Sequence, residues 1–124
     1  MINNDIICAI STPQGSGAIA VLRLSGNESI ALCDKIFKTP TNKRLIDQQP
    51  NTLHFGNLLD GERIVDEVVV SIFKGPRSYT GEDVVEISCH GSVYIQQQIL
   101  QVLIRNGARL AKPGEFTLRA FING

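Results

Sequence analysis

The sequence predicts an α+β fold, a single mixed sheet domain with flanking helices. Short β-branched runs bounded by glycine, proline and serine recur along the chain and predict strands. Two longer segments place apolar residues at helical spacing. No internal repeat or linker divides the 124 residues, a length that fits one domain. Residues 1–124 are therefore expected to form one unit.

The first third of the chain predicts two strands and a helix. Ile6 to Ile10 is a short apolar run, and Ala18 to Leu24 is a second, closed by a Ser-Gly pair. From Asn27 the apolar residues fall at helical spacing, so a helix is expected to end near Lys38. Asn27 is the expected N-cap.

The middle of the chain predicts a surface connection followed by a hairpin. Residues 39–51 contain two prolines and several polar residues, which is typical of a loop. Leu53 to Leu58 and Ile64 to Phe73 flank an Asp60-Gly61 pair, and such a pair favours a tight turn because it tolerates positive φ. The two runs are expected to form an antiparallel pair.

The last third predicts a strand, a helix, a short extended piece and a second helix. The strand contains Glu86; Ser92 is the expected N-cap of the helix that follows, and Asn106-Gly107 its stop. Residues 108–111 are expected to be extended, and Glu115 to Phe121 to begin a helix in which the sequence ends. The wetter side of the first helix is expected to hold Gln96, Gln97, Gln98 and Gln101.

The composition restricts the kinds of partner and site that the chain is expected to have. Twelve basic and twelve acidic residues cancel, so the overall charge does not indicate a nucleic-acid or membrane partner. The three cysteines lack CxxC spacing, which predicts buried thiols in a reducing compartment rather than disulfides or a zinc site. No leader or apolar run of membrane-spanning length is seen. The expected location is the cytoplasm.

The segment GPRSYTGEDVVEISCHG, residues 75–91, is the most informative part of the sequence. Because side chains alternate along a strand, Val85, Ile87 and Cys89 are expected to face the core. The opposite face then carries a carboxylate, a hydroxyl and an imidazole, from Glu86, Ser88 and His90. The loop before the strand suits a segment that covers a ligand. The row indicates either a site or an edge strand with one solvated face.

Arg23 and Glu86 are the candidate site residues. Arg23 lies among apolar strand neighbours, where a guanidinium needs a carboxylate, an aromatic face or an anionic ligand to offset its desolvation. The carboxylate of Glu86, between Val85 and Ile87, also needs a partner. Arg23 and Glu86 therefore either pair with each other or bind a ligand. His90 is either an acid/base group or a residue at the start of the helix. With His54 on a different strand, no metal site is expected.

Residues 12–18, TPQGSGA, invite interpretation as a phosphate-binding loop. That loop requires GK[ST] opening a helix, whereas here a strand follows. We therefore expect a tight turn at residues 12–18, and no GTP binding or hydrolysis by this chain.

Three blocks of sequence indicate a family. DIICAISTPQGSGAIAVLRLSG, GPRSYTGEDVVEISCHGS and GARLAKPGEFTLRAFING together resemble the N-terminal domain of the MnmE (TrmE) family of tRNA modification GTPases. The blocks lie at the start, middle and end of the chain, so the resemblance covers essentially all of it. SYTGEDVVEISCHG and KPGEFTLRAFING are long enough to be very specific.

The resemblance implies a fold similar to the tetrahydrofolate-binding domain of glycine-cleavage aminomethyltransferase. It implies binding of a reduced folate such as 5-formyltetrahydrofolate, and a homodimer. In the family the full-length protein adds a helical domain and a GTPase domain, which binds GTP, Mg²⁺ and K⁺. It acts with MnmG (GidA), an FAD-dependent protein, on the wobble uridine of certain tRNAs.

The family's folate contacts fall on Arg23 and Glu86, the residues that were hardest to explain structurally. A third contact in the family is a lysine that follows FING, beyond Gly124. Two small departures from the family pattern are Ser16, where the family often has a basic residue, and Ser92, where it often has glycine.

Two other functions stay open at this point. The chain could be a free-standing folate-dependent one-carbon transferase that uses His90 or Cys89, or an interaction domain without a ligand. No adjacent nucleophile and base can be identified in the sequence to support the transferase.

Overall fold

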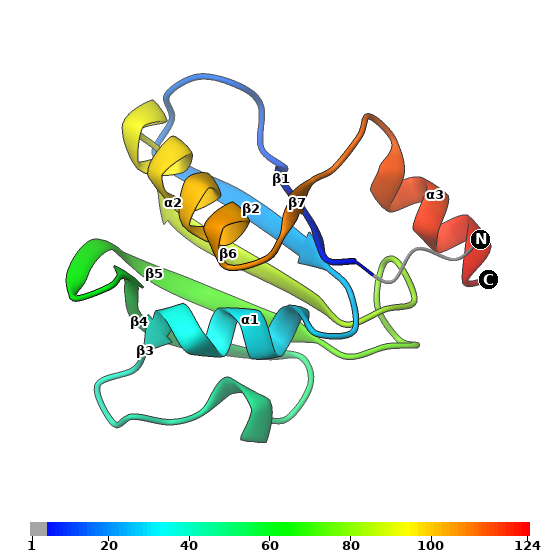
Figure 1. Cartoon of the computed structure of the whole chain (residues 1–124), viewed down its shortest axis with the longest axis horizontal. Helices are drawn as coiled ribbons and strands as arrows, with labels where there is room; N and C mark the ends of the chain where they lie inside the picture. Colours follow the sequence, from blue (N-terminus) through cyan, green and yellow to red (C-terminus); the bar gives the residue numbers. More distant parts are fainter. Residues whose placement is uncertain (1–4) are drawn as a thin grey trace.

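The computed structural model describes residues 5–124 and confirms the α+β class, with one mixed sheet of seven strands and three α-helices (Figure 1). The sheet order is β3-β4-β5-β6-β2-β1-β7, and every neighbouring pair is antiparallel except β1 and β7. The strands are β1 (Ile7–Ile10), β2 (Ile19–Ser25), β3 (Phe37–Lys38), β4 (Thr52–Asp60), β5 (Arg63–Phe73), β6 (Val84–His90) and β7 (Arg109–Leu110). The helices are α1 (Ser29–Ile36), α2 (Val93–Arg105) and α3 (Glu115–Ile122), with a short 3-10 turn, η1 (Leu45–Asp47).

The hydrophobic core lies between the sheet and two of the helices. Figure 1 shows α1 and α2 on the same face of the sheet. Leu22, Ile87 and Val70 lie opposite one another on three adjacent strands and are fully buried. Ile99 and Leu103 of α2 belong to the same buried cluster. We call the other side of the sheet the open face; among the described residues, the loop that contains Tyr79 and the start of α3 reach it over Arg23.

The alternation expected for the strand that contains Glu86 is confirmed. Val85, Ile87 and Cys89 are buried, whereas Glu86 is half-buried and points to the open face. The hairpin is also confirmed: Asp60 pairs with Arg63, and Gly61 in the turn has φ of 62°. The register shifts between Leu58 and Leu59 of β4, where Val65 is an extra residue in β5.

The expected start and end of the first helix are wrong. Asn27 lies outside α1, and Glu28 occupies the N-cap position without a side-chain hydrogen bond. At the other end Phe37 and Lys38 leave the helix and pair with β4. Phe37 is buried in this arrangement, and its strand covers the edge of β4, so tertiary pairing overrides the helical spacing.

The second helix begins as expected, but one of its glutamines does not lie where expected. Ser92 Oγ accepts a hydrogen bond from Ile95 N at 3.0 Å, as an N-cap does. Gln96 is 3% exposed rather than on the wet side, because its Nε2 donates to the carbonyl oxygens of Gly15 and Gly91. The other three glutamines are exposed or half-buried, which confirms the expectation for Gln97, Gln98 and Gln101.

The connection at residues 39–51 is mostly exposed, as predicted, but Leu45 within it is buried in the core. The extended piece and the helix at the end of the chain are confirmed as β7 and α3. Residues 1–4 of the expected 1–124 unit lie outside the described residues. None of the helices in the described part of the chain has the length and apolar character needed to cross a membrane.

Candidate functional site

Arg23 and Glu86 lie directly opposite each other on neighbouring strands β2 and β6. Arg23 Nε donates to Glu86 Oε2 at 3.0 Å, and Arg23 Nη2 lies 2.9 Å from the same oxygen. Each side chain is 28% exposed. The structural pairing considered from the sequence is therefore present, on the open face and within reach of solvent.

The guanidinium of Arg23 also lies over two aromatic rings. Its central carbon is 5.1 Å from the ring centroid of Tyr79 and 5.7 Å from that of Phe116, within the range of a cation–π interaction. Tyr79 belongs to the loop that was expected to cover a ligand, and its hydroxyl group hydrogen-bonds Thr117 Oγ1 at 2.9 Å. The loop and the start of α3 thus meet over Arg23.

A hollow of about 270 Å³ opens beside this arrangement. It is lined by Arg23, Tyr79 and Phe116, together with residues 9–11 at the end of β1, Gly114 before α3, and Thr117. A cation next to aromatic surfaces suits a flat, polar ring system.

Glu86 has unequal oxygens. Oε2 accepts the hydrogen bond from Arg23 Nε and lies in ion-pair contact with Nη2, while Oε1 makes no hydrogen bond to any residue within 5–124. A carboxylate offers about four acceptor positions. Arg23 therefore fixes the orientation of the carboxylate and leaves acceptor capacity for a second donor.

A buried ion-pair network holds the loop and α3 in place. Arg119 of α3 is 5% exposed, and its Nη1 donates to Glu82 Oε1 at 3.1 Å and to the Asp5 carbonyl at 2.7 Å. Glu82 Oε1 also accepts from Ser25 Oγ at 2.8 Å. This network was not predicted from the sequence; the local signal for it was an arginine between apolar residues in FTLRAF.

A second arginine connects β7 to the same network. Arg109 Nε donates to Asp5 Oδ2 at 2.6 Å, and its Nη2 donates to Glu115 Oε2 at 2.6 Å. The hydrogen bonds from Arg109, with a smaller contribution from Arg119, hold the pKa values of Asp5 and Glu115 below their usual range. The carboxylates of Asp5 and Glu115 therefore stay ionised at acidic pH values at which carboxyl groups without such partners are protonated.

We expect acid to loosen α3 from the sheet. A carboxyl group whose pKa is lower in the folded state contributes stability that is present above its unfolded pKa, about 3.9 for Asp and 4.3 for Glu, and is lost as the pH falls through the folded value. The protection of the α3 amides against exchange, relative to their intrinsic exchange rate at each pH, should therefore fall below about pH 4. Replacing Arg109 by Leu should weaken this dependence, and an unchanged pH profile in Arg109→Leu would contradict the assignment.

The cysteine and histidine proposed for a transferase are poorly placed for it. Cys89 is 4% exposed, and burial raises the pKa of its thiol to about 11, so little thiolate exists at neutral pH. His90 Nδ1 lies 2.7 Å from Asp66 Oδ1, at the end of β6 and before the helix begins. It is four residues from Glu86, roughly 13 Å along the strand. Within residues 5–124 no cluster of ligands for a metal ion is found either.

Comparison with known proteins identifies the family. The sequence model of the protein family described as GTP-binding protein TrmE N-terminus matches residues 6–124. The chain belongs to the TrmE N-terminal family. Relatives named tRNA modification GTPase MnmE agree: that of Flavobacterium johnsoniae is 59% identical over 124 residues, which is 100% of this chain and 27% of the relative.

Two further relatives with the same name are similar. The Bacillus subtilis protein is 54% identical over 122 residues, or 97% of this chain and 27% of its own length. The Bacteroides thetaiotaomicron protein is 55% identical over 123 residues, or 98% of this chain and 26% of its own length. The chain thus corresponds to about a quarter of these GTPases, and it carries the TrmE N-terminal region without a Walker motif in its sequence.

Proposed function

We propose that this chain is the folate-binding, self-associating N-terminal module of a tRNA modification GTPase. In this proposal Arg23 and Glu86 hold the pterin end of a reduced folate such as 5-formyltetrahydrofolate. The observation that carries the proposal is the half-satisfied carboxylate of Glu86 on the open face, fixed by Arg23, which itself lines a hollow with aromatic walls. Membership of the TrmE N-terminal family supports it.

The chemistry of these side chains fits a pterin. The pterin ring presents an N3–H and a 2-amino group side by side, and a carboxylate accepts such a pair of donors. Glu86 Oε1 has acceptor capacity for them, while Arg23 supplies a positive charge for a folate oxygen. The hollow, at about 270 Å³, lies below the roughly 300 Å³ at which pockets for whole small molecules begin. It suits the ring, with the rest of the folate outside.

The folate supplies one-carbon chemistry when it is bound, and this chain's residues orient it. Tyr79 and Phe116 limit access of water to the guanidinium of Arg23, which strengthens its interactions with an anionic group. Cys89 is buried and His90 lies four residues along β6 from Glu86, so neither of the two groups considered for a transferase lies beside the pair. The proposal is therefore a binding role for this chain and not a catalytic one.

The roles of the full-length protein are part of the proposal. We infer that it acts in the cytoplasm with MnmG (GidA) on the wobble uridine of certain tRNAs, giving a carboxymethylaminomethyl- or aminomethyl-type group at C5. GTP, Mg²⁺ and K⁺ would bind in a GTPase domain outside this chain. The three free, buried cysteines agree with a reducing compartment.

Calorimetric titration with 5-formyltetrahydrofolate tests the site. Glu86→Gln keeps the shape but sets an amide donor against a pterin donor, so we expect affinity to fall about ten-fold or more, roughly 1.5 to 3 kcal/mol. Arg23→Lys should also weaken binding, because an ammonium lacks the planar fork. Glu62→Gln, in the exposed turn after β4, removes the same charge and should leave affinity unchanged.

The same variants separate ligand binding from structure. If Arg23 and Glu86 form only a structural pair, each single substitution should mainly lower the melting temperature, and the double variant should melt higher than the worse single one. The titration is best done in a form of the protein that continues past Gly124, so that the family's third contact is present. Unchanged folate affinity of Glu86→Gln in that form would refute the assignment.

We expect the chain to associate as a two-fold dimer. A closed isologous contact is the commonest arrangement of identical subunits, and the family resemblance implies one. Light scattering over a range of protein concentrations should give a mass above that of the 13.6 kDa monomer. A monomer mass that does not change up to high concentration would contradict this expectation.

A further inference from the structure

The overall charge of the chain is zero, but its positive charges are not evenly spread. Four of its twelve basic residues fall within ten positions, Lys35, Lys38, Lys43 and Arg44, around the end of α1 and the edge strand β3. All four are exposed. Only Arg44 is neutralised, by Asp34 at 2.5 Å; no ion pair joins the three lysines to a carboxylate within residues 5–124.

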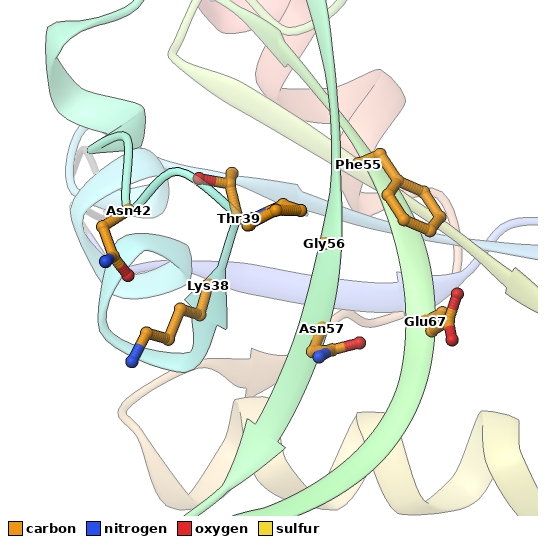
Figure 2. A pocket seen from close by; sticks show the side chains of 8 residues that line it. Lys38, Thr39, Asn42, Phe55, Gly56, Asn57 and Glu67 are labelled. Atoms are coloured by element: carbon orange, nitrogen blue, oxygen red, sulfur yellow. The ribbon is translucent and has the colours of Figure 1, made fainter.

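These cations border two adjoining hollows that share Lys38 and Asn42. One, of about 260 Å³, lies at the edge of the sheet and is lined by all four basic side chains. The other, of about 420 Å³, extends onto the open face (Figure 2). We call the two hollows together the edge groove.

The second hollow adds aromatic and polar groups to the cations. Lys38, Asn57 and Glu67 are register partners on β3, β4 and β5, so they form one row across the open face. Phe55 lies on the same face of β4 and is 56% exposed. In Figure 2 the side chains of Phe55, Asn57 and Glu67 lie toward β5, and those of Lys38 and Asn42 lie toward β3 and the loop after it.

The backbone around the edge groove is held in place by a close approach of two strands and by hydrogen bonds within the loop. A Cβ at Gly56 would collide with the Lys38 carbonyl group, so β4 approaches β3 closely between the two parts of the groove. Lys43 N donates to Thr39 Oγ1 at 2.8 Å, and Asn42 N donates to the Thr39 carbonyl at 3.1 Å. Asn42 has φ of 56°, a conformation uncommon outside glycine. The loop that presents Lys43 is therefore held in a defined shape.

We propose that the edge groove binds single-stranded RNA, with phosphates at Lys38 and Lys43 and an unpaired base stacked on Phe55. Basic grooves with exposed aromatic rings bind single strands in this way, because every base has a face that stacks. Asn57 and Glu67 lie where they can hydrogen-bond the edge of such a base, and a carboxylate matches its amino or ring N–H donors. An acidic peptide, the main competing ligand of a basic surface, would place its charges against Glu67.

The inference is independent of folate binding, since Arg23 and Glu86 line neither part of the edge groove. The choice of RNA rather than DNA as the ligand rests on the proposed action of the full-length protein on tRNA; the rest of the inference does not. The test below contains no folate, so its failure is distinguishable from failure of the folate titration.

Fluorescence anisotropy with a labelled RNA stem-loop that has an unpaired loop tests the proposal. Lys38→Gln/Lys43→Gln should weaken binding roughly ten-fold at low salt, and the slope of log affinity against log salt should fall by about 1.4, since each phosphate contact to a single strand contributes about 0.7. Phe55→Leu should weaken binding about five-fold or more without changing that slope. Arg77→Gln/Lys112→Gln removes two exposed charges elsewhere and should change neither quantity appreciably.

Several outcomes would overturn the proposal. They are the absence of RNA binding at low salt, equal losses in the control double variant, or tighter binding of poly-glutamate than of the RNA. Ultraviolet cross-linking of the unaltered chain to the same RNA gives a measurement without any substitution. The cross-linked peptide is expected to contain Phe55, and cross-links confined to other peptides would refute the assignment.

Discussion

Replacing Arg119 by Met should destabilise the protein by about 3 kcal/mol, because it leaves the largely buried carboxylate of Glu82 without its cation. The Glu82 side chain is 11% exposed, so water cannot fully replace the guanidinium. Proteins of this size have a total stability of about 5 to 15 kcal/mol, and the loss is a large part of it. The difference in the free energy of unfolding between Arg119→Met and the unaltered chain can be measured by urea unfolding.

The structure gives a matched control and a local readout for this substitution. Arg105→Met removes an ion pair to Asp60 in which the arginine side chain is 50% exposed, so it should cost much less than Arg119→Met. Amide exchange should show that α3 loosens first in Arg119→Met, which would move Phe116 away from Arg23. Equal losses in the two variants would show that the buried network does not hold α3.

Replacing Gly91 by Ala should cost up to about 3 kcal/mol, the upper end for overpacking. A Cβ at Gly91 would run into the carbonyl group of Gly17, and a backbone obstacle cannot rotate away as a side chain does. The two segments are joined there by hydrogen bonds, Gly17 N to the Gly91 carbonyl at 3.1 Å and Gly91 N to the Ala18 carbonyl at 3.2 Å. Thermal unfolding of Gly91→Ala measures the effect.

Gly17→Ala is the matched control, since it lies in the same contact. A Cβ there would meet only the Ile19 carbonyl oxygen, at 3.9 Å, which is an ordinary contact. We expect a change within about 0.5 kcal/mol, with a small gain from the stiffer unfolded chain. If Gly91→Ala were as harmless as Gly17→Ala, the close approach of the two backbones would not be a constraint on the fold.

The fold class could be predicted from the amino-acid sequence, because the hydrophobic period of a segment is a local property. The alternation around Glu86 assigned the faces of β6 correctly, and the Asp60-Gly61 pair located the hairpin. Ser92 was identified as an N-cap from its place before a helical run. Arg23 and Glu86 were singled out because a charge among apolar neighbours needs a partner, which is also evident locally.

The partners of the polar side chains, in contrast, depend on contacts between segments that are far apart in the sequence. Gln96 is buried because its amide donates to the carbonyl groups of Gly91, just before α2, and of Gly15, 81 positions away. Phe37 leaves its helix to pair with β4. The contact of Arg119 with Glu82 joins residues 37 positions apart. Such contacts depend on how the strands are ordered in the sheet, and periodicity within one segment carries no information on that order.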